Sequence, residues 1–134
     1  TEGDPIKSNL RQAGEMIDRA AHDGGDIVCL AEMFAHRHMT KAEAIERAEP
    51  IPGPITDAIG ERARRHNCYV TANLLERSGD RIHNSSALID RAGNVAGVYR
   101  KVYPTPGEVD TGTTPGTETP VFETDFGRVG LAIC

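Results

Sequence analysis

A change of hydrophobic period near residue 69 constrains the fold of this chain more than any other feature. Before it, two segments (5–22 and 54–66) carry apolar residues at spacings of three and four, the pattern of amphipathic helices. After it, the pattern becomes that of consecutive strands joined by short turns that contain glycine. We expect three strands, at residues 69–76, 82–90 and 95–101. Helices followed by adjacent strands predict a layered α/β domain.

The expected helices carry recognisable start signals. Asp4 and Pro5 precede the first apolar position of the first helix, and proline is favoured in a first helical turn. Thr40 and Glu43 have the T-x-x-E spacing of a capping box, which predicts the start of a short helix between the two longer ones.

Two continuous apolar runs, 27–31 and 129–133, predict strands buried on both faces of a sheet. Glu32 follows the first run, and Cys134 follows the second. Lys101 ends the last of the three adjacent strands. Because ligands gather at the carboxyl ends of strands in open α/β folds, we expect these three side chains to meet.

A carboxylate, an ammonium and a thiol in one place can perform nucleophilic catalysis without histidine. The thiolate is the reactive form of cysteine, and a nearby carboxylate can remove the thiol proton as a general base. A nearby lysine favours the thiolate and neutralises an oxyanion that develops on the substrate.

Other interpretations of the same residues stay open. Taken singly, a Glu or Lys after a strand is a solvated surface residue, and a Cys in an apolar run is a small buried hydrophobe. Glu32 could instead join Cys29, His36 and His38 as metal ligands, although their spacing matches no zinc pattern.

Composition excludes several classes of protein. Of 134 residues, 38% are hydrophobic and 26% charged, as in a globular protein. Fifteen basic and twenty acidic residues are mixed along the chain, without the basic stripe of a nucleic-acid surface. No apolar stretch approaches the roughly 18 residues of a membrane span. Three widely spaced cysteines suggest no disulfide framework, so we expect a cytoplasmic protein.

Three segments of the chain resemble the signature segments of the nitrilase superfamily of carbon–nitrogen hydrolases. They are GGDIVCLAEMF, GNVAGVYRKVYPTPGE and FETDFGRVGLAIC, and they occur in the family's order of Glu, Lys and Cys. The resemblance implies an α-β-β-α sandwich that is incomplete in this chain. Residues 1–134 would form a single partial domain that lacks a first strand and everything after the nucleophile.

The resemblance also implies roles for individual residues. Glu32 matches the general base, Lys101 the cation that stabilises the oxyanion, and Cys134 the nucleophile that forms a thioester. Glu108, in an expected Pro/Gly/Thr-rich loop over 102–120, matches a second glutamate that positions the substrate and the lysine. The family needs no cofactor and no metal, and its members commonly form homo-oligomers.

The function expected from this resemblance is hydrolysis of an amide or N-carbamoyl amide of a small molecule. A nitrilase that acts on C≡N would use the same three residues. The remaining alternative belongs to a different class, a non-catalytic structural or interaction fragment of such a protein.

Overall fold

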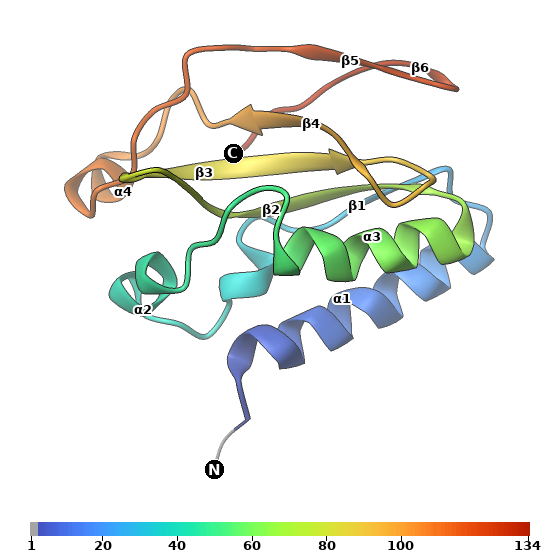
Figure 1. Cartoon of the computed structure of the whole chain (residues 1–134), viewed down its shortest axis with the longest axis horizontal. Helices are drawn as coiled ribbons and strands as arrows, with labels where there is room; N and C mark the ends of the chain where they lie inside the picture. Colours follow the sequence, from blue (N-terminus) through green and yellow to red (C-terminus); the bar gives the residue numbers. More distant parts are fainter. Residues whose placement is uncertain (1–2) are drawn as a thin grey trace.

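The computed structural model describes residues 3–134, in which two helices cover one face of a four-stranded sheet (Figure 1). The elements are α1 (Pro5–His22), β1 (Ile27–Cys29), the 3-10 turn η1 (Phe34–His36), α2 (Lys41–Glu46), α3 (Pro54–His66), β2 (Tyr69–Ser78), β3 (Arg81–Ile89), β4 (Val95–Arg100), α4 (Pro106–Asp110), β5 (Val121–Thr124) and β6 (Gly127–Gly130). The sheet has the order β1-β2-β3-β4, with β1 parallel to β2 and the other neighbours antiparallel.

The predicted helix starts are confirmed. The Asp4 carboxylate accepts a hydrogen bond from the Ile6 N–H at 3.1 Å, with Pro5 in the first turn of α1. Thr40 and Glu43 form the expected capping box at the start of α2. These bonds satisfy N–H groups that have no partner within the helix, which fixes where each helix begins.

The apolar faces of α1 and α3 pack together against the sheet and form the main core. Ile17 of α1 and Ile55 and Ile59 of α3 are completely or almost completely buried. Burial of each such side chain contributes roughly 1.5–3 kcal/mol. The helical layer therefore holds one face of the sheet rigidly in place.

The hairpin of β2 and β3 separates an apolar face from a polar one. Ala72 and Leu74 belong to the core beneath the sheet. Asn73 lies between them, so its side chain lies on the opposite face, where Ser86 is its cross-strand partner. Asn84 pairs with the next residue on that face, Leu75. The alternation thus places two asparagines on the face away from α1 and α3.

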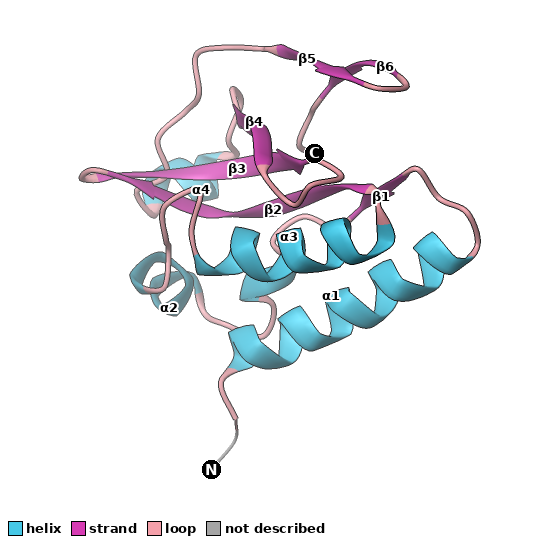
Figure 2. Cartoon of the chain, turned by 45° about the vertical axis from the view of Figure 1, so that its right-hand side comes forward, coloured by secondary structure: helices cyan, strands magenta, loops and turns pink. Residues whose placement is uncertain are grey.

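A second sheet of two strands, β5 and β6, lies across the four-stranded sheet from α1 and α3 (Figures 1 and 2). Close packing at Gly97 of β4 allows this approach. A Cβ atom at Gly97 would lie 2.0 Å from Cε1 of Phe122 in β5. The main sheet is therefore covered by helices on one side and by this ribbon on the other.

The structure differs from the sequence predictions at both apolar runs. β1 ends at Cys29, which is exposed, and β6 ends at Gly130, so residues 131–134 are outside any strand. Within residues 3–134, β5 is the only strand that pairs with β6. Burial on both faces requires layers and partner strands that apolar composition alone does not specify.

The predicted α/β class is confirmed, and residues 3–134 provide one helical layer of it. The expected loop 102–120 contains the short helix α4, which the sequence analysis missed. In the part of the chain that the structure describes, no helix is both long and apolar enough to span a membrane.

Candidate active site

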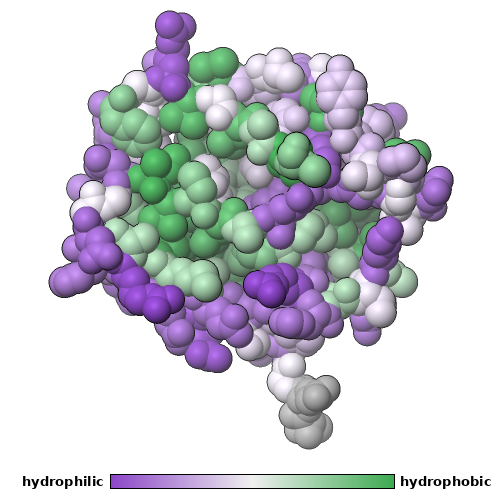
Figure 3. All heavy atoms as spheres, turned by 180° about the vertical axis from the view of Figure 1, so that it is seen from behind, coloured by the Kyte–Doolittle hydropathy of each residue, from purple (hydrophilic) through white to green (hydrophobic). Residues whose placement is uncertain are grey.

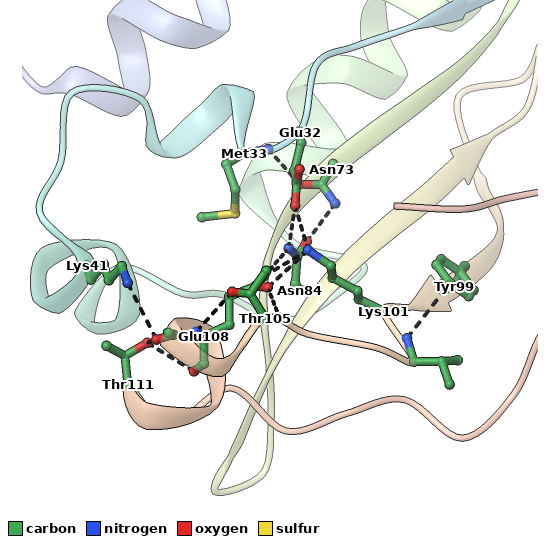
Figure 4. A network of polar contacts seen from close by, with 12 residues as sticks. Glu32, Met33, Lys41, Asn73, Asn84, Tyr99, Lys101, Thr105, Glu108 and Thr111 are labelled. Atoms are coloured by element: carbon green, nitrogen blue, oxygen red, sulfur yellow. Dashed lines mark hydrogen bonds and ion pairs between the residues drawn. The ribbon is translucent and has the colours of Figure 1, made fainter. Parts of the chain in front are cut away.

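Lys101 follows β4, and its ammonium group lies between two carboxylates (Figure 4). Nζ is 3.1 Å from Oε1 of Glu32 and 3.0 Å from Oε2 of Glu108. The lysine side chain is only 4% exposed. Burial alone would lower the pKa of Lys101, but the two carboxylates outweigh it and raise that pKa. The ammonium therefore stays charged and fixed in position.

Glu108 is held by its own helix as well as by the lysine. Its Oε2 accepts a hydrogen bond of 2.6 Å from the Thr105 N–H, which completes a capping box at the start of α4. Burial would raise the pKa of Glu108, but the bonds from Asn84, Thr105 and Lys101 lower it to about 2. Glu108 is therefore an ionised, well-ordered partner of the lysine at neutral pH.

Asn84 of β3 connects the two carboxylates. Its Nδ2 donates to Oε1 of Glu32 at 2.9 Å and to Oε1 of Glu108 at 2.8 Å. Its Oδ1 accepts a bond of 2.8 Å from Nδ2 of Asn73 in β2. Oδ1 of Asn73 in turn accepts a hydrogen bond of 2.6 Å from the backbone N–H of Met33.

The direction of donation in this chain of hydrogen bonds is fixed from one end to the other. A backbone N–H such as that of Met33 can only donate, so Asn73 must present oxygen to it and nitrogen to Asn84. Asn84 must then present nitrogen to the carboxylates. Met33 has a φ of 56°, in the left-handed region that a non-glycine residue rarely adopts. Such backbone strain is typical of sites that fix a neighbouring side chain, here Glu32.

Cys134 lies outside this cluster of contacts but beside it. It lines, together with Glu32 and Asn73, a pocket of about 350 Å³. Within residues 3–134 its thiol forms no hydrogen bond with Glu32 or Lys101. Figure 3 views the molecule from the side opposite to Figure 1 and shows apolar side chains gathered around a hollow on that face.

The structure thus brings Glu32, Lys101 and Glu108 into direct contact and leaves Cys134 at the edge of the same site. The sequence analysis missed Asn73 and Asn84. A signal for them was present, because each is a polar residue within a strand whose neighbours predict burial, and buried polar groups need hydrogen-bond partners.

The alternative of a metal site at Cys29, Glu32, His36 and His38 does not match the geometry. Among residues 3–134, no three His, Cys, Asp or Glu side chains are grouped so that they could hold a metal ion. His36 is buried and His38 is exposed.

Comparisons with known proteins agree on one family. The sequence profile described as "Carbon-nitrogen hydrolase" matches residues 5–134. Omega-amidase NIT2 of Xenopus tropicalis is 31% identical over 140 residues, which cover 97% of this chain and 50% of the relative. A bifunctional nitrilase/nitrile hydratase of Lupinus angustifolius is 34% identical over 146 residues, which cover 95% of this chain and 42% of the relative.

Solved structures give the same fold. An amidase from Nesterenkonia sp. superposes with a TM-score of 0.83 at 18% identity, over 96% of this chain and 50% of the amidase. The α-β-β-α class of the sequence prediction is therefore confirmed at the level of the fold. The chain spans half the length of that amidase and of the frog relative.

Proposed function

The chain belongs to the carbon-nitrogen hydrolase family, and we propose that it provides the Glu–Lys–Cys site with which such a protein hydrolyses amide C–N bonds. The observation that carries this proposal is the buried Lys101 ammonium, held by Glu32 and Glu108 beside the pocket that Cys134 lines. A fixed cation suits the negative charge that develops in acyl transfer. The substrates are small carboxamides, N-carbamoyl amides included.

In the first half of the proposed reaction, Sγ of Cys134 adds to the carbonyl carbon of the amide. Glu32 removes the thiol proton, because the thiolate is the nucleophile. The C–S bond forms as the carbonyl electron pair moves onto oxygen, and Lys101 stabilises this oxyanion. When the carbonyl re-forms, the C–N bond breaks and Glu32 returns the proton to nitrogen. Ammonia or an amine leaves, and a thioester remains.

In the second half, water hydrolyses the thioester. Glu32 removes a proton from the water, whose oxygen bonds to the carbonyl carbon. Lys101 again stabilises the oxyanion, the C–S bond breaks, and the proton returns to the sulfur of Cys134. The net reaction is amide plus water to carboxylic acid plus amine. Glu108 takes part through Lys101, whose ammonium it holds at 3.0 Å, and is a positioning residue.

The test is ammonia release by the full-length protein from a panel of small amides, N-carbamoyl compounds and nitriles. We expect amides and N-carbamoyl amides to be hydrolysed. Loss of a catalytic nucleophile lowers kcat by about 10⁴-fold or more, and we expect this of Cys134→Ser. Cys29→Ser makes the same exchange at the other exposed thiol, which lines the same pocket without a role in the proposed reaction, and should lower the rate far less than Cys134→Ser does. Glu32→Gln and Lys101→Ala should each abolish turnover without unfolding the protein.

Labelling by iodoacetamide, located by mass spectrometry, gives a second readout. Cys134 should be labelled, and substrate should protect it. Near-normal turnover in a folded Cys134→Ser protein would contradict the proposal. Turnover of nitriles alone would assign the same three residues to C≡N chemistry, the chemistry for which the lupin relative is named.

A further inference from the structure

The ion pair of Glu76 and Arg100 lies in the main sheet, on the face opposite to the candidate active site. Glu76 follows Leu74 by two residues in β2, so its side chain is on the face that α1 and α3 cover. That side chain is only 6% exposed. A buried carboxylate is costly unless it is paired and hydrogen-bonded, so its partners decide whether the fold tolerates it.

Both carboxylate oxygens of Glu76 are hydrogen-bonded. Nη2 of Arg100, the last residue of β4, donates to Oε1 at 2.6 Å, and Nε of the same guanidinium donates to Oε2 at 2.9 Å. The Ser85 hydroxyl of β3 donates to Oε2 at 2.6 Å. Burial would raise the pKa of Glu76, but these bonds outweigh it and lower that pKa, so the carboxylate stays ionised. One carboxylate therefore joins three adjacent strands.

This ion pair is one residue away from the candidate active site. Side chains alternate between the two faces, so Arg100 points toward the helical layer and Lys101, the next residue, points toward Glu32 and Glu108 (Figure 4). The Lys101 N–H donates to the Asn84 carbonyl at 2.8 Å, which continues the pairing of β4 with β3. Anchoring the side chain of Arg100 therefore also anchors the backbone from which the Lys101 side chain starts.

The segment after α4 holds the same backbone on its other side. The Gly116 N–H donates to the Lys101 carbonyl at 2.8 Å. A Cβ atom at Gly116 would lie 2.2 Å from the carbonyl oxygen of Arg100, so the two segments are in close contact. Because Lys101 is hydrogen-bonded through both its N–H and its carbonyl, a shift of Arg100 would disturb both bonds and displace the ammonium.

We propose that Glu76 is a positioning residue of the candidate active site, which fixes the end of β4 through Arg100 and thereby fixes the Lys101 ammonium. The inference rests on the proposed function, in which Lys101 stabilises the oxyanion. Such stabilisation depends on a cation that is already in place when the charge develops. A displacement of about 1 Å, caused by a change far from the chemistry, can lower a rate by about 100-fold. Glu76 and Arg100 themselves do not touch the substrate in this proposal.

The first test measures amide hydrolysis by the full-length protein after the ion pair is broken. Glu76→Gln keeps the size of the side chain and removes its charge. It should lower kcat by about tenfold to 100-fold and leave KM nearly unchanged, because the oxyanion is absent from the bound ground state. Arg100→Gln should cause a similar loss. Arg100→Lys keeps the cation without the two-bond contact and should retain part of the rate.

The control breaks an ion pair that has no contact with Lys101. Arg62 of α3 pairs with Asp18 of α1, and its side chain is partly exposed, as that of Arg100 is. Arg62→Gln should leave kcat unchanged. A merely structural role for Glu76 would lower kcat only in proportion to the loss of folded protein, which circular dichroism measures, and that result would overturn the inference.

The second test does not depend on turnover. Hydrogen exchange at the backbone amides of Lys101 and Gly116, followed by mass spectrometry, reports the opening of the two bonds that hold the Lys101 backbone. Exchange at both amides should be about tenfold faster in Glu76→Gln than in the unmodified protein and unchanged in Arg62→Gln. Unchanged exchange in Glu76→Gln would overturn the inference even if kcat falls.

The two tests separate this inference from the proposed function. No ammonia release by the unmodified protein from any amide contradicts the proposed function, whereas the exchange rates still decide whether Glu76 holds Lys101. Faster exchange together with a normal kcat in Glu76→Gln would overturn the effect of this ion pair on the reaction. If Glu76→Gln does not fold, Arg100→Lys replaces it in both tests and should show smaller changes in the same directions; no change in either would overturn the inference.

Discussion

Asn84 fixes the separation of the two glutamates, because one amide nitrogen donates to both. The bonds from Nδ2 to Glu32 and to Glu108 measure 2.9 and 2.8 Å, and Lys101 contacts the same two carboxylates. A neutral donor and a cation thus hold two negative charges that would otherwise repel each other. At the scale of single residues, this amide is as important for the geometry of the site as the lysine.

The first prediction replaces this amide by a carboxylate. In Asn84→Asp, a third negative charge lies beside Glu108, whose pKa is about 2 in the unmodified protein. A neighbouring like charge raises the pKa of a carboxyl group, by about one unit or more at this distance. We therefore expect the acid limb of the pH–rate profile to move to higher pH, together with a lower kcat at neutral pH.

The control is Asn94→Asp, which adds the same charge at an exposed turn. It should leave the pH–rate profile in place. An Asn84→Asp protein whose acid limb stays at the pH of the unmodified protein would show that Asn84 does not set the protonation of the site.

At the scale of elements, the chain uses the same capping signal twice with different consequences. Thr40 and Glu43 cap α2 and, among residues 3–134, form no hydrogen bond or ion pair with Glu32, Lys101 or Glu108, whereas Thr105 and Glu108 cap α4 and Glu108 also binds Lys101. The second box therefore couples the start of a helix to the position of the ammonium.

The second prediction compares the two caps. Thr40→Ala and Thr105→Ala should each lower the free energy of unfolding by about 1 kcal/mol, the usual cost of losing such a cap. Only Thr105→Ala should also lower kcat/KM, by about fivefold if the same ~1 kcal/mol is lost in the transition state. Urea unfolding and steady-state kinetics measure the two effects. Equal kinetic losses in both variants would argue against the coupling.

The third prediction concerns the contact of α3 with the turn between β3 and β4. A Cβ atom at Gly60 would lie 2.3 Å from the carbonyl oxygen of Gly93, and backbone cannot yield there cheaply. Gly60→Ala should therefore cost about 1–3 kcal/mol of stability, as overpacking of a core does, despite the higher helix propensity of alanine. Gly3→Ala, where nothing lies within 4 Å, is the control in urea unfolding. A stabilised Gly60→Ala protein would contradict this packing.

Local signals predicted some elements well and others not at all. The apolar period of α1 and α3 specifies helices directly, because an amphipathic helix carries its own pattern. The predicted length of β1 was wrong: the apolar run covers 27–31, but the strand ends at Cys29. Burial of the residues after Cys29 depends on layers that are formed by segments far away in the sequence. α4 was missed although Thr105 and Glu108 have the same T-x-x-E spacing as the box at α2. Its proline and glycine favoured a loop in the sequence analysis.

At the scale of the whole molecule, the sequence predicted which residues gather but not how they are held. The positions of Glu32 and Lys101 at strand ends predicted that they meet, and the resemblance added Glu108; the three side chains are in contact. The support from Asn73 and Asn84 arises from the register of β2 against β3, which the sequence leaves open. The catalytic role of Cys134 stays a prediction, because its thiol is adjacent to the cluster without a bond to it.

The fourth prediction is a pH dependence of stability that belongs to the whole fold. Glu108 has a pKa of about 2 in the folded protein and an ordinary value near 4.5 when unfolded. Because the folded pKa is lowered, its contribution to stability is complete above about pH 4.5 and is lost as the pH falls toward 2. Urea unfolding at several pH values should show this decline.

Glu108→Gln removes the titrating carboxyl group. The free energy of unfolding should then decline less steeply between pH 4.5 and 2, although it should still decline. Part of the decline remains because Glu76 also has a lowered pKa: burial opposes the shift, but hydrogen bonds from Arg100 and Ser85 outweigh it. The variant should be less stable than the unmodified protein at pH 7 and should approach it near pH 2, where both lack the Glu108 charge. A difference in stability that stays constant from pH 7 to pH 2 would mean that the glutamate contributes by packing and not by its ionised contacts to Lys101 and Asn84.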